Sequence, residues 1–281
     1  MSLETRIYQK ENSAHFLKHL KASLADIYNS RFLAKQITVR DIKAQYRKSY
    51  LGILWAFITP LTTAFVWIFL NATGTVKLSD TGVPYPVFVF SGTLLWSIIK
   101  EAINTPAGST AGSMGIITKI NFPKEALIVS GVYQLLFNSS IKIVMLFVFV
   151  FVFGVGFHFS MLLFPITVLV AVFVGITIGL FLAPILMLYG DVGRLNNFIL
   201  NFMMYVTPVI YIIPKKGILK TLMELNPFTP IILTGRDVLV GMFPQYLGYY
   251  FIVLGCCIPL FFMGLVLYRI AIPIIVERSS S

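Results

Sequence analysis

The stretch "YRKSYLGILWAFITP", residues 46–60, begins with cations and becomes almost wholly apolar from Trp55 onward. A segment of this kind predicts a chain that follows a membrane surface and then enters the bilayer. Ten of the 22 Lys and Arg residues precede Leu51, against four acids. Cations beside a first span are typical of a cytoplasmic segment, because they favour the side with the anionic leaflet. We therefore expect a cytoplasmic N-terminus and a membrane span that begins near residue 51.

The composition extends this expectation to the whole chain. Of its 281 residues 57% are apolar and 12% are charged, and the mean hydropathy is +0.85, whereas soluble domains carry about 25% charged residues. Apolar runs of about 20 residues, enough for a helix to cross a bilayer, recur along the sequence. The predicted fold class is an all-α polytopic membrane protein. The net charge of +11 does not indicate nucleic-acid binding, because the cations are concentrated beside the first span.

Six spans fit the apolar runs best, and the charges between them support a topology with both termini in the cytoplasm. The predicted spans cover about 51–73, 85–104, 128–155, 161–189, 195–213 and 246–271. With this arrangement 16 Lys and Arg lie inside and five lie outside, as the positive-inside rule requires. The predicted organisation is a cytoplasmic tail and interface helix over 1–50, a transmembrane domain over 51–273 and a cytoplasmic tail over 274–281. On the fourth span small residues recur every four positions, which favours close helix packing; they are Ala171, Gly175, Gly179 and Ala183.

Three segments outside the spans have a recognisable pattern. Residues 31–50 predict an interfacial helix, although Leu33 and Ile37 fall outside its apolar arc. That arc spans about 80° of a helical wheel and contains Phe32, Val39, Ile42, Tyr46 and Tyr50. A plain cationic tail is the alternative. Residues 104–126 form a loop that either presents a short helix to a partner or is a flexible connector. Between spans five and six, residues 218–225 and 231–240 predict two short amphipathic or re-entrant helices at the outer mouth, too short to cross.

Signs of chemistry within the chain are few. The sequence contains no phosphate loop and no metal-ligand spacing, so we predict no catalytic residue, metal site or cofactor, and no enzymatic activity by the chain itself. Charges inside the spans are rare, which does not favour a proton- or sodium-coupled carrier. Lys142 is the main exception. We expect its side chain to reach toward the inner surface, and a polar cavity is the alternative.

The fifth span carries a mixed aromatic and amide pattern. Phe198, Phe202 and Tyr205 share one helical face, and Asn197, Asn201 and Met204 share the neighbouring one. Trp55, Thr59 and Thr62 give a similar face on the first span. Such stripes are often ordinary core. They are also suited to sugars, whose apolar ring faces stack on aromatic groups while their hydroxyls bond to amides.

Several motifs, in order along the chain, resemble the membrane subunits of ABC-2 type exporters of polysaccharides, which export O-antigen, capsule or teichoic acid chains. The motifs are "YRKSYLGILWAFITPL" (46–61), "NFPKE" (121–125), "YGDVGRL" (189–195), "TPVIY" (207–211) and "LNPFTP" (225–230). Each alone is weak, but five in order over most of the chain are specific. One departure is Gly190, where the family often has Arg.

The resemblance implies a bacterial cytoplasmic-membrane protein that forms a homodimer, binds two copies of a P-loop ATP-binding subunit and exports a lipid-linked polysaccharide. ATP and magnesium would bind the partner, with no cofactor in this chain and no nucleic acid; membrane lipids would surround it. The implied channel-lining residues are Trp55, Thr59, Thr62, Phe198, Asn201, Phe202 and Tyr205. The implied ATPase-docking residues are Arg40, Lys43, Tyr46, Arg47, Phe122, Pro123, Lys124 and Glu125, and the implied outer gate comprises Pro208, Tyr211, Asn226 and Pro227. The alternatives are a lipid or drug exporter of the same type and a membrane enzyme acting on isoprenoid-linked sugars.

Overall fold

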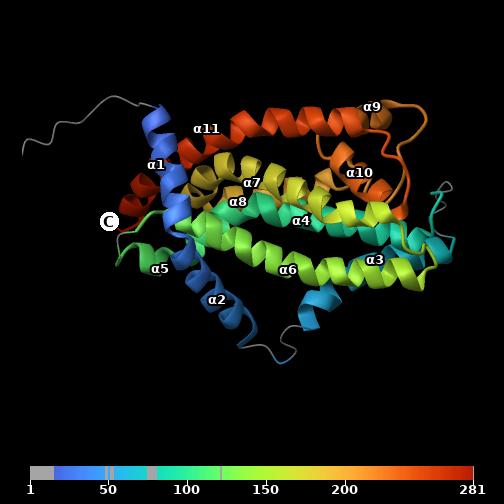
Figure 1. Ribbon diagram of the computed structural model, residues 1–281, viewed down its shortest axis with the longest axis horizontal. Helices are drawn as coiled ribbons and strands as arrows, with labels where there is room; N and C mark the ends of the chain where they lie inside the picture. Colours follow the sequence, from blue (N-terminus) through green and yellow to red (C-terminus); the bar gives the residue numbers. More distant parts are fainter. Residues whose placement is uncertain (1–15, 48–49, 51–53, 75–80, 121, 281) are drawn as a thin grey trace, which may run out of the picture.

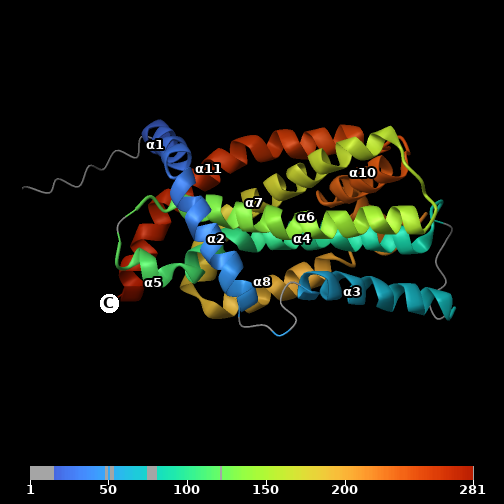
Figure 2. The same cartoon turned by 60° about the horizontal axis from the view of Figure 1, so that its bottom comes forward.

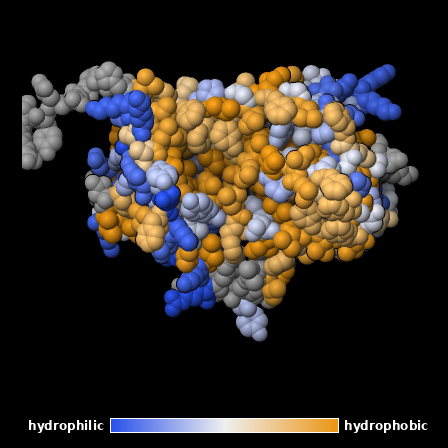
Figure 3. Space-filling model, in the orientation of Figure 1, coloured by the Kyte–Doolittle hydropathy of each residue, from blue (hydrophilic) through white to orange (hydrophobic). Residues whose placement is uncertain are grey.

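The computed structural model describes residues 16–47, 50, 54–74, 81–120 and 122–280. Over these residues the chain is helical with connecting turns and no strand, as predicted. Long helices run side by side along the length of the molecule, and two N-terminal helices cross one end of them (Figure 1). Hydrophilic residues gather over α1 and α2 at that end and near α9 at the other, with apolar residues between (Figure 3). This banding is what a bilayer requires of a spanning protein.

Four helices in the described part of the chain are long and apolar enough to cross a membrane. They are α4 (Tyr85–Gly112), α6 (Glu125–Val152), α7 (Phe164–Leu188, preceded by the 3₁₀ turn η2, Phe159–Leu163) and α11 (Leu247–Ser280). They match predicted spans two, three, four and six. The last of them continues through the predicted C-terminal tail from residue 274.

The predicted first and fifth spans correspond to shorter helices. α3 (Trp55–Ala72) has 18 residues and lies beside α4 (Figure 2), while the predicted start at Leu51 is outside the described residues. α8 (Gly190–Met203) has 14 residues, and the chain continues as turns. A continuous helix over 195–213 was therefore a wrong prediction. One reason is that Pro208 has no N–H to donate. The other is that side chains from α10 (Thr229–Val240) and from Asn226 bond to the carbonyls of the segment.

The centre of the bundle is the α4–α7 pair, and the small-residue ladder lies between these helices. A Cβ added to Gly175 would lie 2.5 Å from the Ala102 Cβ, and one added to Gly179 would lie 2.4 Å from the Ile103 carbonyl oxygen. The predicted close packing is confirmed. α4 runs eight residues past the predicted end at 104, through a Gly-, Ser- and Thr-rich stretch. The hydroxyls of that stretch find acceptors in carbonyls one turn back, so the helical course leaves them with hydrogen-bond partners.

The N-terminal segment forms two helices, α1 (Phe16–Asn29) and α2 (Arg31–Arg47), and only the second was predicted. α2 packs on α6 through Ala34, Ile37 and Thr38, whose hydroxyl lies 3.1 Å from the Ser130 hydroxyl. The apolar arc that predicted this helix points elsewhere, since Phe32 is 70% exposed. α2 therefore has two faces, one packed on the bundle and one open, which is the arrangement an interfacial helix needs.

The remaining helices lie at the two ends of the bundle. α5 (Met114–Ile117) is a short helix in the predicted loop after α4. At the opposite end α9 (Ile218–Leu225) and α10 (Thr229–Val240) confirm the two short helices between spans five and six. α10 is buried among α4, α7 and α11.

Candidate functional site

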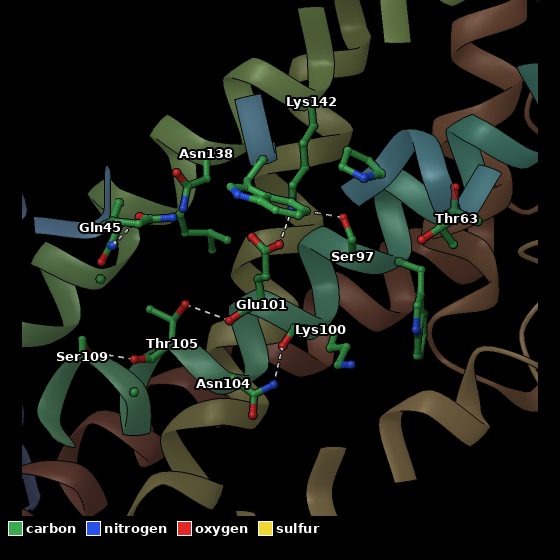
Figure 4. Close-up of a pocket in the computed structure, with 18 of the residues that line it drawn as sticks. Gln45, Thr63, Ser97, Lys100, Glu101, Asn104, Thr105, Ser109, Asn138 and Lys142 are labelled. Atoms are coloured by element: carbon green, nitrogen blue, oxygen red, sulfur yellow. Dashed lines mark hydrogen bonds and ion pairs between the residues drawn. The ribbon is translucent and has the colours of Figure 1, made fainter. Parts of the chain in front are cut away.

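A polar cavity of about 890 Å³ lies between α3, α4, α6 and α8, with the end of α2 closing one side. Figure 4 shows side chains from these helices converging on it. Ten of the twenty described residues that line it carry a hydroxyl or an amide group, and two indoles, Trp55 of α3 and Trp96 of α4, form part of the wall. Most polar groups come from one side of α4, where Ser97, Glu101, Asn104 and Thr105 follow one another at helical spacing.

A buried cation from α6 points into this cavity. The Lys142 ammonium pairs with the Glu101 carboxylate and lies 3.2 Å from the Ser97 Oγ (Figure 4). The Lys142 side chain is only 9% exposed. The expectation that it reaches toward the inner surface was wrong. A largely buried ammonium is stabilised by a counter-charge, and α4 supplies one in Glu101.

Amide groups join α4 to α8 on the other wall of the cavity. The Lys100 ammonium donates to the Asn201 Oδ1 at 2.7 Å. The Asn196 amide donates to the Asn104 Oδ1 at 2.9 Å, and Asn104 donates to the Asn197 Oδ1 at 3.4 Å. The amide face predicted on the fifth span therefore contacts the polar side of α4.

The residues predicted to line a channel divide into two groups. Trp55 and Asn201 line the cavity, whereas Phe198, Phe202 and Tyr205 are exposed on the outside of the chain. The Tyr205 ring contacts Trp67 of α3 edge-on, with centroids 6.4 Å apart. The other two predicted positions do not show whether they face the cavity or the outside. Thr62 is exposed and donates to the Ile58 carbonyl of its own helix. The side chain of Thr59 lies outside the described part. One chain does not bring the two groups together.

The predicted docking residues also divide. Arg40, Lys43 and Arg47 are exposed along α2, and Pro123 is exposed before α6; the side chain of Tyr46 is outside the described part. The Lys124 ammonium lies 4.9 Å from the centre of the Phe122 ring. Burial lowers the pKa of this lysine, against the opposing effect of the nearby Glu125 carboxylate.

Glu125 differs from the other docking residues, because its side chain is engaged inside the chain. It accepts from Ser23 of α1 at 2.8 Å and from Arg269 of α11 at 2.5 Å, and Arg269 also pairs with Asp26 at 2.6 Å. The side chains of Asp26, Glu125 and Arg269 border a second cavity, of about 420 Å³. The network joins α1, α6 and α11 at the end that carries the N-terminal helices. Sequence analysis missed it, because Asp26 and Arg269 are 243 residues apart.

Arg236 of α10 organises the predicted outer gate and was not predicted at all. Its buried guanidinium donates to the carbonyls of Pro208 at 3.2 Å and Val209 at 2.8 Å and lies 3.6 Å from the centre of the Phe88 ring. Gly92 permits this approach, since a Cβ there would lie 2.1 Å from the Val209 oxygen. The signal in the sequence was an arginine within the apolar run "IILTGRDVLV", 231–240.

Three of the four predicted gate residues contribute to the same segment. The buried Asn226 amide donates to the Val206 carbonyl at 3.2 Å and to the Thr207 Oγ1 at 2.8 Å. Tyr211 donates its hydroxyl to the Tyr205 carbonyl, and Pro208 is the acceptor of Arg236. Pro227 is exposed. The chain after α8 is thus held in a defined, non-helical course.

Comparison with known proteins places these features in a family. The sequence model described as ABC-2 type transporter matches residues 33–240. The chain is 26% identical over 209 residues to the O-antigen export system permease protein RfbA of Myxococcus xanthus, a match that covers 73% of this chain and 79% of the relative. It is 25% identical over 211 residues to the protein of the same name from Klebsiella pneumoniae, with the same coverage.

Proposed function

We propose, from the premise that the chain belongs to the ABC-2 type transporter family, that it is the channel-forming membrane subunit of an ATP-driven exporter of a lipid-linked polysaccharide. The observation that carries the proposal is the likeness to relatives named as O-antigen export permeases over 73% of the chain. Those names favour a glycan over the lipid or drug cargo that the motifs alone left open.

In this proposal two copies of the chain face each other through α3 and α8. Phe198 and Phe202 are 69% and 61% exposed in the single chain, so within a membrane their rings face either lipid or a second chain, and the proposal assigns them to a second chain. A two-fold axis is the commonest symmetry of such assemblies. Each copy would place its aromatic residues along a common path, where a polymer could slide between weak stacking contacts.

The energy would come from two P-loop subunits at the end that carries α1 and α2. ATP and magnesium would bind those subunits and none of this chain's residues. Closure of the ATPases would push on the cations of α2 and on the Phe122–Lys124 turn. Export then requires that the ATP-bound state favours the open channel by its free energy.

The proposed topology counts α3 and α8 as the first and fifth of six spans, in a bacterial cytoplasmic membrane with both termini in the cytoplasm. It is supported by the position of α1, α2 and the C-terminus at one end of the bundle (Figure 1). The outer helices α9 and α10, with Arg236 holding the segment after α8, would then form the outward end of the path.

The first test is purification of the tagged chain from its native membranes in mild detergent, with mass spectrometry of the proteins that accompany it. We expect a P-loop ATPase at about one copy per chain. A double charge reversal on α2, Arg40→Glu with Lys43→Glu, should abolish that recovery. Lys220→Glu, an exposed cation at the opposite end, should leave it unchanged. Recovery of the chain alone, under conditions that keep known ABC complexes intact, would refute the proposal.

A further inference from the structure

The cavity between α3, α4, α6 and α8 has an excess of positive charge. Among the described residues that line it, Lys100 and Lys142 are basic and Glu101 alone is acidic. A lysine within a membrane helix is expensive to insert and is usually retained for a function. The close packing of α4 on α7 is made by uncharged residues, Gly175 and Gly179 against Ala102 and Ile103. The Lys142–Glu101 pair is therefore not needed for that packing. The excess charge therefore points to an anionic ligand.

The two members of the Lys142–Glu101 ion pair differ in exposure, which favours replacement of Glu101 by a ligand. The Lys142 side chain is 9% exposed, whereas that of Glu101 is 41% exposed. The carboxylate can thus rotate into the cavity and be hydrated, while the ammonium stays where it is. A phosphate that enters would replace Glu101 as the partner of Lys142, and charge-assisted hydrogen bonds to phosphate are among the strongest in proteins. The Ser97 Oγ accepts from the ammonium at 3.2 Å and so helps to hold Lys142 in place.

The rest of the wall matches a sugar rather than a bare phosphate. Asn104, Asn201 and Gln134 line it with amides. These amides bond to Asn196, Lys100 and Gln45 in the chain alone, and a sugar's hydroxyls would exchange with those partners. Trp55 adds an indole side chain and is 52% exposed. The volume of about 890 Å³ is in the range of small-molecule sites, about 300–1,000 Å³. It is large enough for one or two sugar rings with their phosphates.

We infer that this cavity binds the phosphate-bearing sugar at the reducing end of the lipid-linked glycan, with Lys142 and Lys100 on the phosphate and Trp55 on the ring. The inference rests on the proposed function for the identity of the ligand. It assigns to one chain a site for the end of the polymer, separate from the path between two chains along which the polymer would slide.

The direct test measures binding to the full chain, purified with its partner subunit and held in lipid nanodiscs. Three probes separate the sources of the phosphate: a short polyprenyl pyrophosphate carrying N-acetylglucosamine, the same polyprenyl pyrophosphate without the sugar, and free N-acetylglucosamine 1-phosphate. We expect the first to bind at least about tenfold more tightly than either of the others, about 1.4 kcal/mol. Equal binding of the first two would show that only the lipid phosphate is recognised and would overturn the sugar assignment.

Charge variants then place the probe in this cavity. Lys100→Gln keeps a donor for Asn201 and removes one positive charge, so binding should weaken about tenfold. Glu101→Gln removes the competing carboxylate and should tighten binding by a few-fold. The matched control is Lys220→Gln, which removes an exposed cation outside the cavity and should bind as the unmodified chain does. Unchanged affinity in both cavity variants would overturn the inference.

The double variant Lys142→Met with Glu101→Gln addresses the case in which the single variant Lys142→Met folds poorly because Glu101 has lost its partner. It leaves no unpaired partner, and it should bind at least about tenfold more weakly than Glu101→Gln alone. Failure of this inference can be distinguished from failure of the proposed function. A chain that recovers its ATPase but shows no effect of these variants disproves the site only. A chain that binds the probe through these residues but recovers no ATPase disproves the exporter and keeps the site.

Discussion

Two buried cations, Arg236 and Lys142, occupy contrasting surroundings in the same bundle. Arg236 is enclosed: its guanidinium meets two backbone carbonyls, the Ser91 hydroxyl at 3.4 Å and the face of Phe88. Lys142 has one carboxylate and one hydroxyl, and it borders a cavity that holds a second lysine. The first cation is satisfied by its own chain, and the second has room for a ligand.

The difference indicates how a charge in a membrane helix can be interpreted. A charge whose partners are backbone carbonyls fixes the course of the chain, because it bonds to the backbone itself. A charge whose partner is a mobile, half-exposed carboxylate can exchange that partner. We therefore assign Arg236 to the architecture of the end of the bundle that carries α9 and α10, and, in line with the inference above, Lys142 to binding.

Arg236→Met should cause the largest loss of stability. The substitution leaves the Pro208 and Val209 carbonyls buried without their donor, and each such group costs about 1–3 kcal/mol. We expect a loss of about 2–4 kcal/mol in the free energy of unfolding, measured by thermal or denaturant unfolding in detergent. Lys220→Met, which disrupts only an exposed pair with Glu224, should change stability by less than about 0.5 kcal/mol. Equal stabilities for the two variants would remove Arg236 from its structural role.

Gly92→Ala should cost somewhat less, through the same contact. Its Cβ would lie 2.1 Å from the Val209 oxygen and 2.4 Å from an Arg236 nitrogen, so the segment after α8 must move. Overpacking of this kind costs about 1–3 kcal/mol. Gly108→Ala on the same helix is the matched control, since nothing lies within 4 Å of its Cβ, and it should be neutral or stabilising by up to about 1 kcal/mol. A Gly92 variant as stable as the Gly108 variant would show that the approach of Arg236 to the backbone is not tight.

The Lys142–Glu101 pair should respond unequally to the loss of each partner. Glu101→Gln leaves a buried ammonium facing a neutral amide, and we expect a loss of about 1–2 kcal/mol in stability. Lys142→Met leaves a carboxylate that is already 41% exposed and can be hydrated, so its cost should be smaller. Unfolding of both variants in one detergent would measure the difference. If Lys142→Met costs as much as Arg236→Met, the contrast between the two cations fails.

The sequence predicted the fold class, four of the spans and the two short outer helices, because each depends on local hydrophobicity. It failed where distant side chains override the local pattern. The end of α8 is the clearest case: residues 204–213 look like the continuation of an apolar helix, and a guanidinium from α10 and the amide of Asn226 hold them in turns. A single sequence contains no signal that pairs Arg236 with Pro208.

The candidate site shows the same division. Trp55 and Asn201, which the resemblance assigned to a channel, both line the cavity within one chain; their place in a channel between two chains stays a prediction. The sequence also separated Lys142 as unusual but gave the wrong direction for its side chain. Its direction depends on Glu101, 41 residues earlier on a different helix, and no periodicity reveals which turn of α4 meets which turn of α6.

The smallest expected effect on stability, and the largest on transport, belongs to Phe202 on α8. The ring is 61% exposed, so Phe202→Ala removes little packing and should change the stability of the isolated chain by less than about 0.5 kcal/mol. If two chains place this face along a glycan path, the same variant should still assemble with its ATPase yet export polysaccharide poorly, as measured by cell-surface glycan in a strain that depends on it. Phe151→Ala is the matched control, because Phe151 of α6 is similarly exposed, 52%, and lies on a different helix; export should persist there. Normal export by the Phe202 variant would mean that its exposed ring contacts lipid, and the exposed aromatic face of α8 would then carry no argument about the channel.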